Sequence, residues 1–179
     1  MSNQAATHAL AKKLGHVLLR QNLRCTAAES CTGGGLAAAI TDIPGSSQWF
    51  DRGFVTYSNA SKQQMLAVPK QILASHGAVS EAVVRAMAEG ALLASEADIS
   101  VAISGIAGPD GGCLEKPVGT VWLAFACRTC QTRAHCYSFV GDRASIREQA
   151  VKVAMDGLMA CADPMMASCG DSPRWPHPK

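Results

Sequence analysis

The segment Cys25-Thr26-Ala27-Ala28-Glu29-Ser30-Cys31-Thr32-Gly33-Gly34-Gly35, followed by the alanine-rich run 36–40, sets the architecture of this chain. Its order is strand, glycine turn and helix. Backbone N–H groups of such a turn face an anion beside the helix dipole, so Thr32, Gly33 and Gly34 are candidates to hold a phosphate or a developing oxyanion. The segment has neither the Gly-Lys-Ser/Thr ending of a Walker A loop nor the dinucleotide-binding Gly-x-Gly-x-x-Gly spacing. An ordinary tight turn is the alternative.

The alternation of strands and helices continues along the chain. Residues 49–58 and 98–104 are rich in β-branched or aromatic types and predict two more strands. Two later apolar segments, 118–127 and 132–140, are close enough to pair as an antiparallel hairpin through 128–131. Helical spacing and capping residues predict further helices over 7–20, 59–68 (ended by Pro69), from Ser80 onward, and 143–161.

This pattern predicts an α/β fold. We expect a single three-layer α/β/α domain with a mixed, mostly parallel sheet that ends in an antiparallel hairpin. The 179 residues, of which 48% are hydrophobic and 17% charged, suffice for one buried core and little more. The domain is expected over residues 1–161. Residues 162–179 contain several prolines and few periodic apolar positions, which favours a mobile tail.

Charge and hydropathy argue against several classes of partner. The 16 Lys and Arg and 14 Asp and Glu give a formal net charge of +2 without a basic run, so no nucleic-acid partner is expected. No stretch approaches the ~18 apolar residues that cross a bilayer. The start, Met1-Ser2-Asn3-Gln4, lacks the features of a signal peptide. We expect a soluble, cytoplasmic protein with no membrane partner.

Eight cysteines raise the question of disulfides or zinc. In the cytoplasm they are expected to stay reduced, and most are interpreted as small hydrophobic side chains in the core. Cys127 and Cys130 have the spacing of metal ligands and Cys136 follows, but no second Cys-x-x-Cys pair completes a structural zinc site. We expect no metal, and a metal-linked role for these three cysteines is the alternative.

Three loops are expected to meet at the carboxyl ends of the strands, where open α/β sheets bind ligands: 30–35, 57–62 and 104–112. Ser30 stands at the amino end of a helix, where neighbouring N–H groups can receive an oxyanion, so it is a candidate nucleophile. A helix cap is the alternative role for Ser30.

A serine nucleophile needs a base, and no histidine falls in a loop placed beside Ser30. Lys62 is the remaining candidate, provided that burial and a nearby positive charge lower its pKa from ~10.4 toward ~7 to 8. A solvated lysine is the alternative. Tyr57 is a candidate to hydrogen-bond the base or the leaving group, or else its hydroxyl lies in water.

Other residues complete the candidate site. Cys31 is a rival nucleophile, but adjacent residues leave a turn in different directions, so only one of Ser30 and Cys31 should face the site. Glu29 is expected to be a buried partner for a cation. Arg143 is a candidate for a bidentate phosphate contact or else a surface residue, and Arg147 is expected to pair with a neighbouring carboxylate. The loop 104–112 either suits a ribose or phosphate group or is an ordinary sharp loop, and its candidate binding residues are Ser104, Gly105, Gly108, Asp110 and Gly111.

Several motifs follow one another in a characteristic order: Ala28-Glu29-Ser30-Cys31-Thr32-Gly33-Gly34, Gly45-Ser46-Ser47, Gly53-Phe54-Val55-Thr56-Tyr57-Ser58-Asn59, Gly77-Ala78-Val79-Ser80, Ser104-Gly105-Ile106-Ala107-Gly108-Pro109-Asp110-Gly111-Gly112 and Lys116-Pro117-Val118-Gly119-Thr120-Val121. From about residue 7 to 161 the chain thereby resembles the CinA C-terminal domain family, the nicotinamide mononucleotide amidohydrolases.

The resemblance implies an enzyme without metal or cofactor that hydrolyses the carboxamide of nicotinamide mononucleotide to nicotinate mononucleotide and ammonia, in pyridine nucleotide salvage. It implies that Ser30 is the nucleophile and Lys62 the base, with Tyr57 in support, in a three-layer domain with a five-stranded sheet. A homodimer is common in similar proteins. Two alternatives remain, a non-catalytic nucleotide-binding or interaction module associated with competence and DNA damage, and an amidase of another small substrate.

Overall fold

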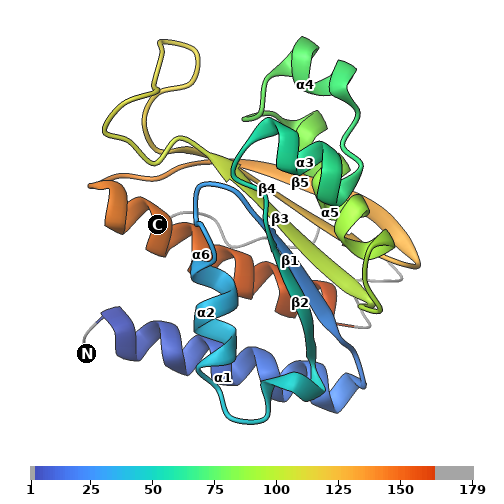
Figure 1. Ribbon diagram of the computed structural model, residues 1–179. Helices are drawn as coiled ribbons and strands as arrows, with labels where there is room; N and C mark the ends of the chain where they lie inside the picture. Colours follow the sequence, from blue (N-terminus) through green and yellow to red (C-terminus); the bar gives the residue numbers. More distant parts are fainter. Residues whose placement is uncertain (1–2, 164–179) are drawn as a thin grey trace.

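The computed structural model describes residues 3–163 (Figure 1). Its five strands form one sheet in the order β2-β1-β3-β4-β5. β1 pairs in parallel with β2 and β3, whereas the β3–β4 and β4–β5 pairs are antiparallel, which confirms the predicted mixed sheet with a final hairpin. The strands are β1 (Cys25–Glu29), β2 (Phe50–Val55), β3 (Ile99–Gly105), β4 (Thr120–Cys127) and β5 (Cys130–Ser138). From residue 164 onward, the expected tail lies outside the described residues.

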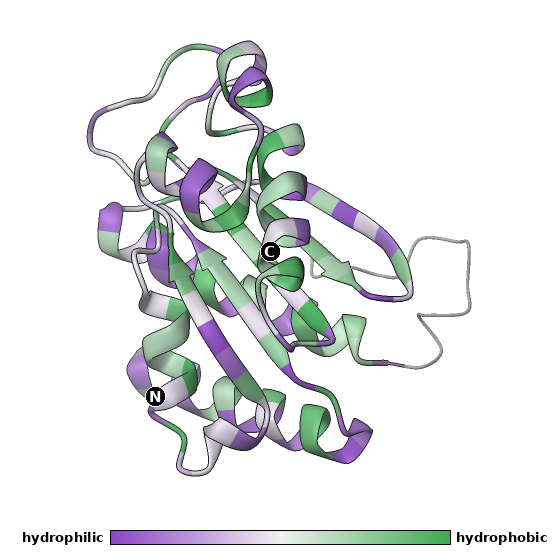
Figure 2. Cartoon of the chain, turned by 45° about the vertical axis from the view of Figure 1, so that its right-hand side comes forward, coloured by the Kyte–Doolittle hydropathy of each residue, from purple (hydrophilic) through white to green (hydrophobic). Residues whose placement is uncertain are grey.

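Helices cover both faces of the sheet, as the α/β/α prediction requires (Figure 1). They are α1 (Asn3–Gln21), α2 (Gly35–Thr41), α3 (Asn59–Leu66), α4 (Lys70–His76), α5 (Glu81–Leu93) and α6 (Arg143–Cys161), with a short 3-10 helix, η1 (Ser46–Gln48). Successive strand residues point to opposite faces. Ala27 and Val101 therefore belong to the core shared with α1, α2 and α6, and Ala28 and Ala102 to the core shared with α3, α4 and α5. Figure 2 shows hydrophobic residues along the interior strands and hydrophilic stretches on both edge strands, β2 and β5.

Helix α4 was not predicted from the sequence. Pro69 ends the preceding helical pattern, but it also stands at the N-cap of α4 with φ −61°. Because proline has no N–H and its φ is already close to the helical value, it both stops one helix and starts another. The hairpin turn is also shorter than expected, since β5 already begins at Cys130.

Cys127 and Cys130 form a disulfide across the hairpin turn, with their Cα atoms 5.4 Å apart. The expectation that the cysteines stay reduced is therefore wrong for this pair, because the two-residue turn sets them opposite each other in the β4–β5 register. Cys25 and Cys31 are buried free thiols, whereas Cys136 is exposed. Over residues 3–163, no group of three or more His, Cys, Asp or Glu side chains is arranged to hold a metal ion.

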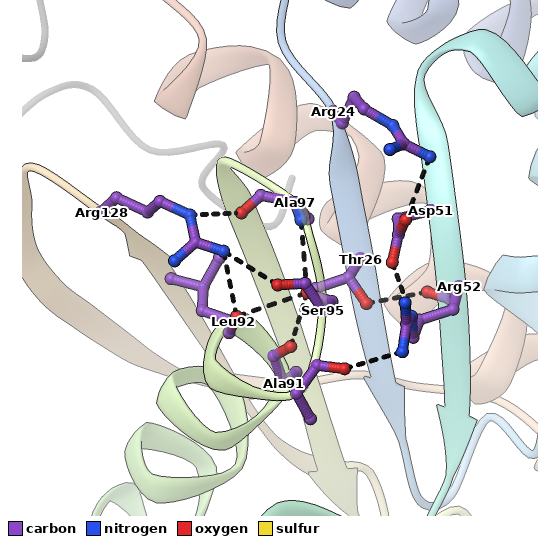
Figure 3. Close-up of polar contacts among 10 residues, drawn as sticks. Arg24, Thr26, Asp51, Arg52, Ala91, Leu92, Ser95, Ala97 and Arg128 are labelled. Carbon is purple, nitrogen blue, oxygen red and sulfur yellow. Dashed lines mark hydrogen bonds and ion pairs between the residues drawn. The ribbon is translucent and has the colours of Figure 1, made fainter.

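Arginines fix the chain at the amino-terminal ends of β1 and β3, the end of the sheet opposite the predicted site (Figure 3). Arg128, in the hairpin turn, donates to the carbonyl oxygens of Ala97 (2.8 Å) and Ser95 (2.9 Å). Arg52, on β2, donates to the carbonyl of Ala94 at 2.9 Å. These contacts satisfy carbonyl groups at the end of α5 and in the loop that follows it, and they anchor the strands that carry the site.

Candidate active site

A cavity of about 260 Å³ lies at the carboxyl ends of β1 and β3. The three loops that the sequence predicted to converge all contribute to it, together with the segment between α4 and α5. Its lining residues are Ser30, Cys31, Tyr57, Lys62, Ala78, Val79, Ser104, Gly105, Ile106, Ala107, Gly108, Asp110, Gly111 and Arg143. Most of the predicted site residues therefore share one cavity.

Ser30 and Lys62 are hydrogen-bonded to each other in this cavity. Ser30 directly follows β1, and its backbone N–H donates to the carbonyl of Ile103 at 2.9 Å, which extends the pairing of β1 with β3. Lys62 Nζ lies 3.0 Å from Ser30 Oγ, and only 1% of the lysine is exposed. The solvated-lysine alternative is therefore wrong.

The amine of Lys62 has two more hydrogen-bonding partners, both on the loop after β2. Nζ donates to the carbonyl of Thr56 at 2.7 Å and lies 3.5 Å from the carbonyl of Tyr57. Ser58 and Ser61 form a capping box that starts α3 and so places Lys62 in its first turn. Burial lowers the pKa of Lys62 below its ordinary value of 10.5, because the charged form loses its hydration. Among the described residues Lys62 has no carboxylate ion-pair partner to oppose that effect.

Glu29 has a different role from the one expected. Its carboxylate is buried and accepts hydrogen bonds from the backbone N–H groups of Gly34 (3.1 Å), Leu36 (3.0 Å) and Ala37 (2.9 Å). Glu29 therefore satisfies the free N–H groups at the start of α2, where a negative charge also meets the positive end of the helix dipole. The expectation that it pairs with a cation is wrong.

The glycine turn after Ser30 is held from inside the chain. Gly33 N–H donates to the Ser30 carbonyl at 3.0 Å, and Gly34 N–H is bound by Glu29. Both residues have positive φ, 58° and 90°, which glycine adopts without strain. These two N–H groups are therefore already engaged, which argues against the expected oxyanion role for Gly33 and Gly34. Over residues 3–163, the backbone N–H groups of Cys31 and Thr32 donate to no other residue.

Arg147 contacts the same turn from α6. Its Nη2 donates to the carbonyl of Thr32 at 2.7 Å, so the expected pairing with a neighbouring carboxylate is wrong. The carboxylate of Glu148 instead pairs with Lys152 at 2.6 Å, and Asp142 caps α6 through the N–H of Ser145. Arg147 is a residue of the site that sequence reasoning missed.

Arg143 and Tyr57 meet at the rim of the cavity. Arg143 donates from Nη1 to the carbonyl of Gly108 at 2.8 Å and from Nη2 to the hydroxyl of Tyr57 at 3.3 Å. Tyr57 remains 62% exposed, so its hydroxyl is available to a ligand that enters the cavity. The guanidinium thus bridges the loop after β2 and the loop after β3.

Cys31 borders the cavity beside Ser30, but only Ser30 contacts Lys62, in agreement with the expectation that one of the two faces the site. The side chain of Cys31 also belongs to the core on the α1, α2 and α6 face. Burial raises the pKa of the Cys31 thiol to about 11, which makes it a poor source of thiolate near neutral pH.

The fold and the site together define a class: an α/β/α domain in which a buried serine–lysine pair lies in a polar cavity at the carboxyl ends of parallel strands. Residues 7–162 match the CinA C-terminal domain, and the chain belongs to that family. No helix among residues 3–163 has the length and apolar character needed to span a membrane.

Individual relatives can be named. The nicotinamide-nucleotide amidohydrolase PncC of Escherichia coli (strain K12) is 56% identical over 151 residues, which cover 83% of this chain and 90% of the relative. The protein of the same name from Pseudomonas putida is 54% identical over 150 residues, which cover 84% of this chain and 93% of that relative. The crystal structure of the competence/damage inducible protein CihA from Agrobacterium tumefaciens superposes with a TM-score of 0.86 at 41% identity, covering 91% of this chain and 98% of that one.

Proposed function

We propose that this protein is an amidohydrolase that converts nicotinamide mononucleotide to nicotinate mononucleotide and ammonia, with Ser30 as nucleophile and Lys62 as base. The observation that carries the proposal is the 3.0 Å contact between Lys62 Nζ and Ser30 Oγ in a buried setting. The two relatives named nicotinamide-nucleotide amidohydrolase, at 56% and 54% identity, support the choice of substrate.

The surroundings of Lys62 suit a neutral amine. A neutral amine has two N–H groups and one lone pair. The carbonyls of Thr56 and Tyr57 accept the two N–H groups, which leaves the lone pair directed at Ser30 Oγ. Burial favours this neutral form, so Lys62 is able to act as a general base.

The reaction then proceeds in two steps. Lys62 takes the hydroxyl proton while Ser30 Oγ bonds to the carboxamide carbon, and the proton passes to nitrogen as the carbon–nitrogen bond breaks and ammonia leaves. A water molecule, deprotonated by Lys62, attacks the resulting ester. Ser30 recovers its proton as the acid is released. The N–H groups of Cys31 and Thr32, which donate to no other residue within residues 3–163, are the donors that we assign to the oxyanion in both steps.

The ribose phosphate is assigned to the opposite side of the cavity. Arg143 supplies a cation at the rim, with the hydroxyl of Tyr57 beside it, and guanidinium groups bind phosphate through paired N–H donors. The loop that carries Gly105, Gly108, Asp110 and Gly111 lines the same wall and offers N–H and carboxylate groups to ribose hydroxyls.

The experiment that tests this function measures ammonia release from nicotinamide mononucleotide by the wild type, Ser30→Ala and Lys62→Ala proteins, with and without a chelator. We expect chelator-resistant activity in the wild type that both substitutions abolish, while Ser30→Ala still binds the nucleotide. A Ser30→Ala protein with a near-normal rate would exclude the serine mechanism. A wild type that binds the nucleotide without releasing ammonia would instead support a non-catalytic binding module.

A further inference from the structure

Ser30 has a neighbour on the adjacent strand that the mechanism does not yet use. β1 and β3 are parallel, with Thr26 opposite Ser100 and Ala28 opposite Ala102. Continued by two residues, the same register sets Ser30 beside Ser104, at the ~4.8 Å spacing of neighbouring strands. Ala28 and Ala102 face α5, and alternation places the two serines on that same face. Lys62 reaches Ser30 from this side, so Ser104 lies beside the reacting pair.

The hydroxyl proton of Ser104 has a fixed direction. Ser104 is 1% exposed, and its Oγ lies 2.8 Å from the carbonyl oxygen of Ala78. A carbonyl oxygen only accepts, so the serine must donate its single proton to it. Within residues 3–163 no group donates to Ser104 Oγ in return. The Ser104 oxygen can therefore accept a hydrogen bond from a ligand in the cavity. It cannot donate one, because its proton is already donated to Ala78.

We infer that Ser104 accepts a hydrogen bond from the NH₂ group of the substrate carboxamide and thereby selects amide over acid and ester, an inference that rests on the proposed function. An amide nitrogen carries two hydrogens, so one can bind Ser104. With that N–H held, the nitrogen lone pair, freed from amide resonance when Ser30 Oγ bonds to the carbon, is directed toward the proton carried by Lys62. Ammonia leaves when that proton is transferred.

The product lacks the group that Ser104 binds. After hydrolysis a carboxylate oxygen replaces the nitrogen, and this oxygen can only accept. Two acceptors then face each other across the cavity, because the Ser104 proton is committed to Ala78. Ser104 thus strengthens binding of the amide and weakens binding of the acid, which favours product release.

The test compares two substrates in three variants. The substrates are nicotinamide mononucleotide and the methyl ester of nicotinate mononucleotide, which has no N–H at the leaving group. Ser104→Ala should lower kcat/KM roughly tenfold for the amide and by less than about threefold for the ester, since one hydrogen bond is lost only with the amide. Ser104→Thr keeps the hydroxyl and should restore most of the preference for amide.

Ser100→Ala is the matched control. Ser100 lies on the same strand and face, and its hydroxyl donates to the Ala88 carbonyl at 2.7 Å, but it does not line the cavity. Its loss should leave the ratio of amide to ester hydrolysis unchanged. A calorimetric titration with nicotinate mononucleotide adds a readout without turnover, and Ser104→Ala should bind this product more tightly than the wild type does.

The possible outcomes separate the two proposals. Equal losses for amide and ester in Ser104→Ala, with unchanged product affinity, would overturn the inference and leave the proposed function standing. A wild type that releases no ammonia from nicotinamide mononucleotide would overturn the proposed function, and the assignment of Ser104 would fall with it. Loss of amide hydrolysis alone, together with tighter product binding, supports the inference.

Discussion

Replacement of Glu29 by glutamine should loosen the turn that carries Ser30. The carboxylate accepts three N–H groups: Oε2 binds Gly34 and Leu36, and Oε1 binds Ala37. An amide of the same shape offers one acceptor oxygen, so at least one N–H at the start of α2 loses its partner. A buried donor left without a partner costs about 1–3 kcal/mol, and loss of the charge at the helix N-terminus adds about 0.3–1 kcal/mol. We therefore expect Glu29→Gln to lower the free energy of unfolding by about 1–4 kcal/mol.

Urea denaturation followed by circular dichroism measures this change, and ammonia release measures its effect on the site. Glu81→Gln is the matched control, because Glu81 also stands in the first turn of a helix but is half-exposed and pairs with Arg85 across one turn. Solvent screening limits that ion pair to about 0.5 kcal/mol or less. We expect Glu29→Gln, but not the control, to lower kcat. Equal stability of the two variants would refute the role of Glu29, and lost stability with unchanged kcat would refute its link to the nucleophile.

Other predictions concern the charged residues around the cavity. The kcat of the wild type should rise with pH through an apparent pKa below the ordinary 10.5 of lysine, because burial lowers the pKa of Lys62 and the base must be neutral; a profile that falls over this range would contradict the base assignment. Arg147→Ala should lower kcat about fivefold to tenfold with little change in KM, because the Thr32 carbonyl loses its charged donor while the rim stays intact. In steady-state kinetics Arg143→Ala should mainly raise KM, and an unchanged KM would remove Arg143 from the phosphate site.

The fold was largely predictable because its signals are local. Helical spacing predicted α6 over 143–161, and β-branched and aromatic residues predicted the strands. Helix α4 was not predicted because its seven residues are too few to show a helical periodicity and because Pro69 was interpreted only as the end of the preceding helix. The disulfide was not predicted for another reason. Two cysteines at metal-ligand spacing are equally compatible with packing in the core, a zinc site or a disulfide across a turn.

The site was predictable only where a motif carried it. Ser30 and Lys62 stand beside a glycine turn and after a strand, which are visible in the sequence. The contact of Arg147 with Thr32 spans 115 residues, and that of Ser104 with Ala78 spans 26. Sequence spacing does not predict contacts between residues so far apart in the chain. Glu29 was misassigned because its burial was foreseen but its partners, three backbone N–H groups, have no sequence signature.

The choice between two adjacent nucleophiles shows how the sheet governs the chemistry. The Ser30 side chain lies on the face of the sheet that α3 covers, and its Oγ is 3.0 Å from Lys62 Nζ. The side chain of Cys31 packs in the core of the opposite face. A thiol is intrinsically the stronger acid, but burial raises the Cys31 pKa to about 11. Because alternation places Lys62 beside Ser30 alone, the proposed mechanism uses the weaker acid as the nucleophile. Exchange of the two side chains should therefore fail to move the activity to position 31, since the lysine would still face position 30.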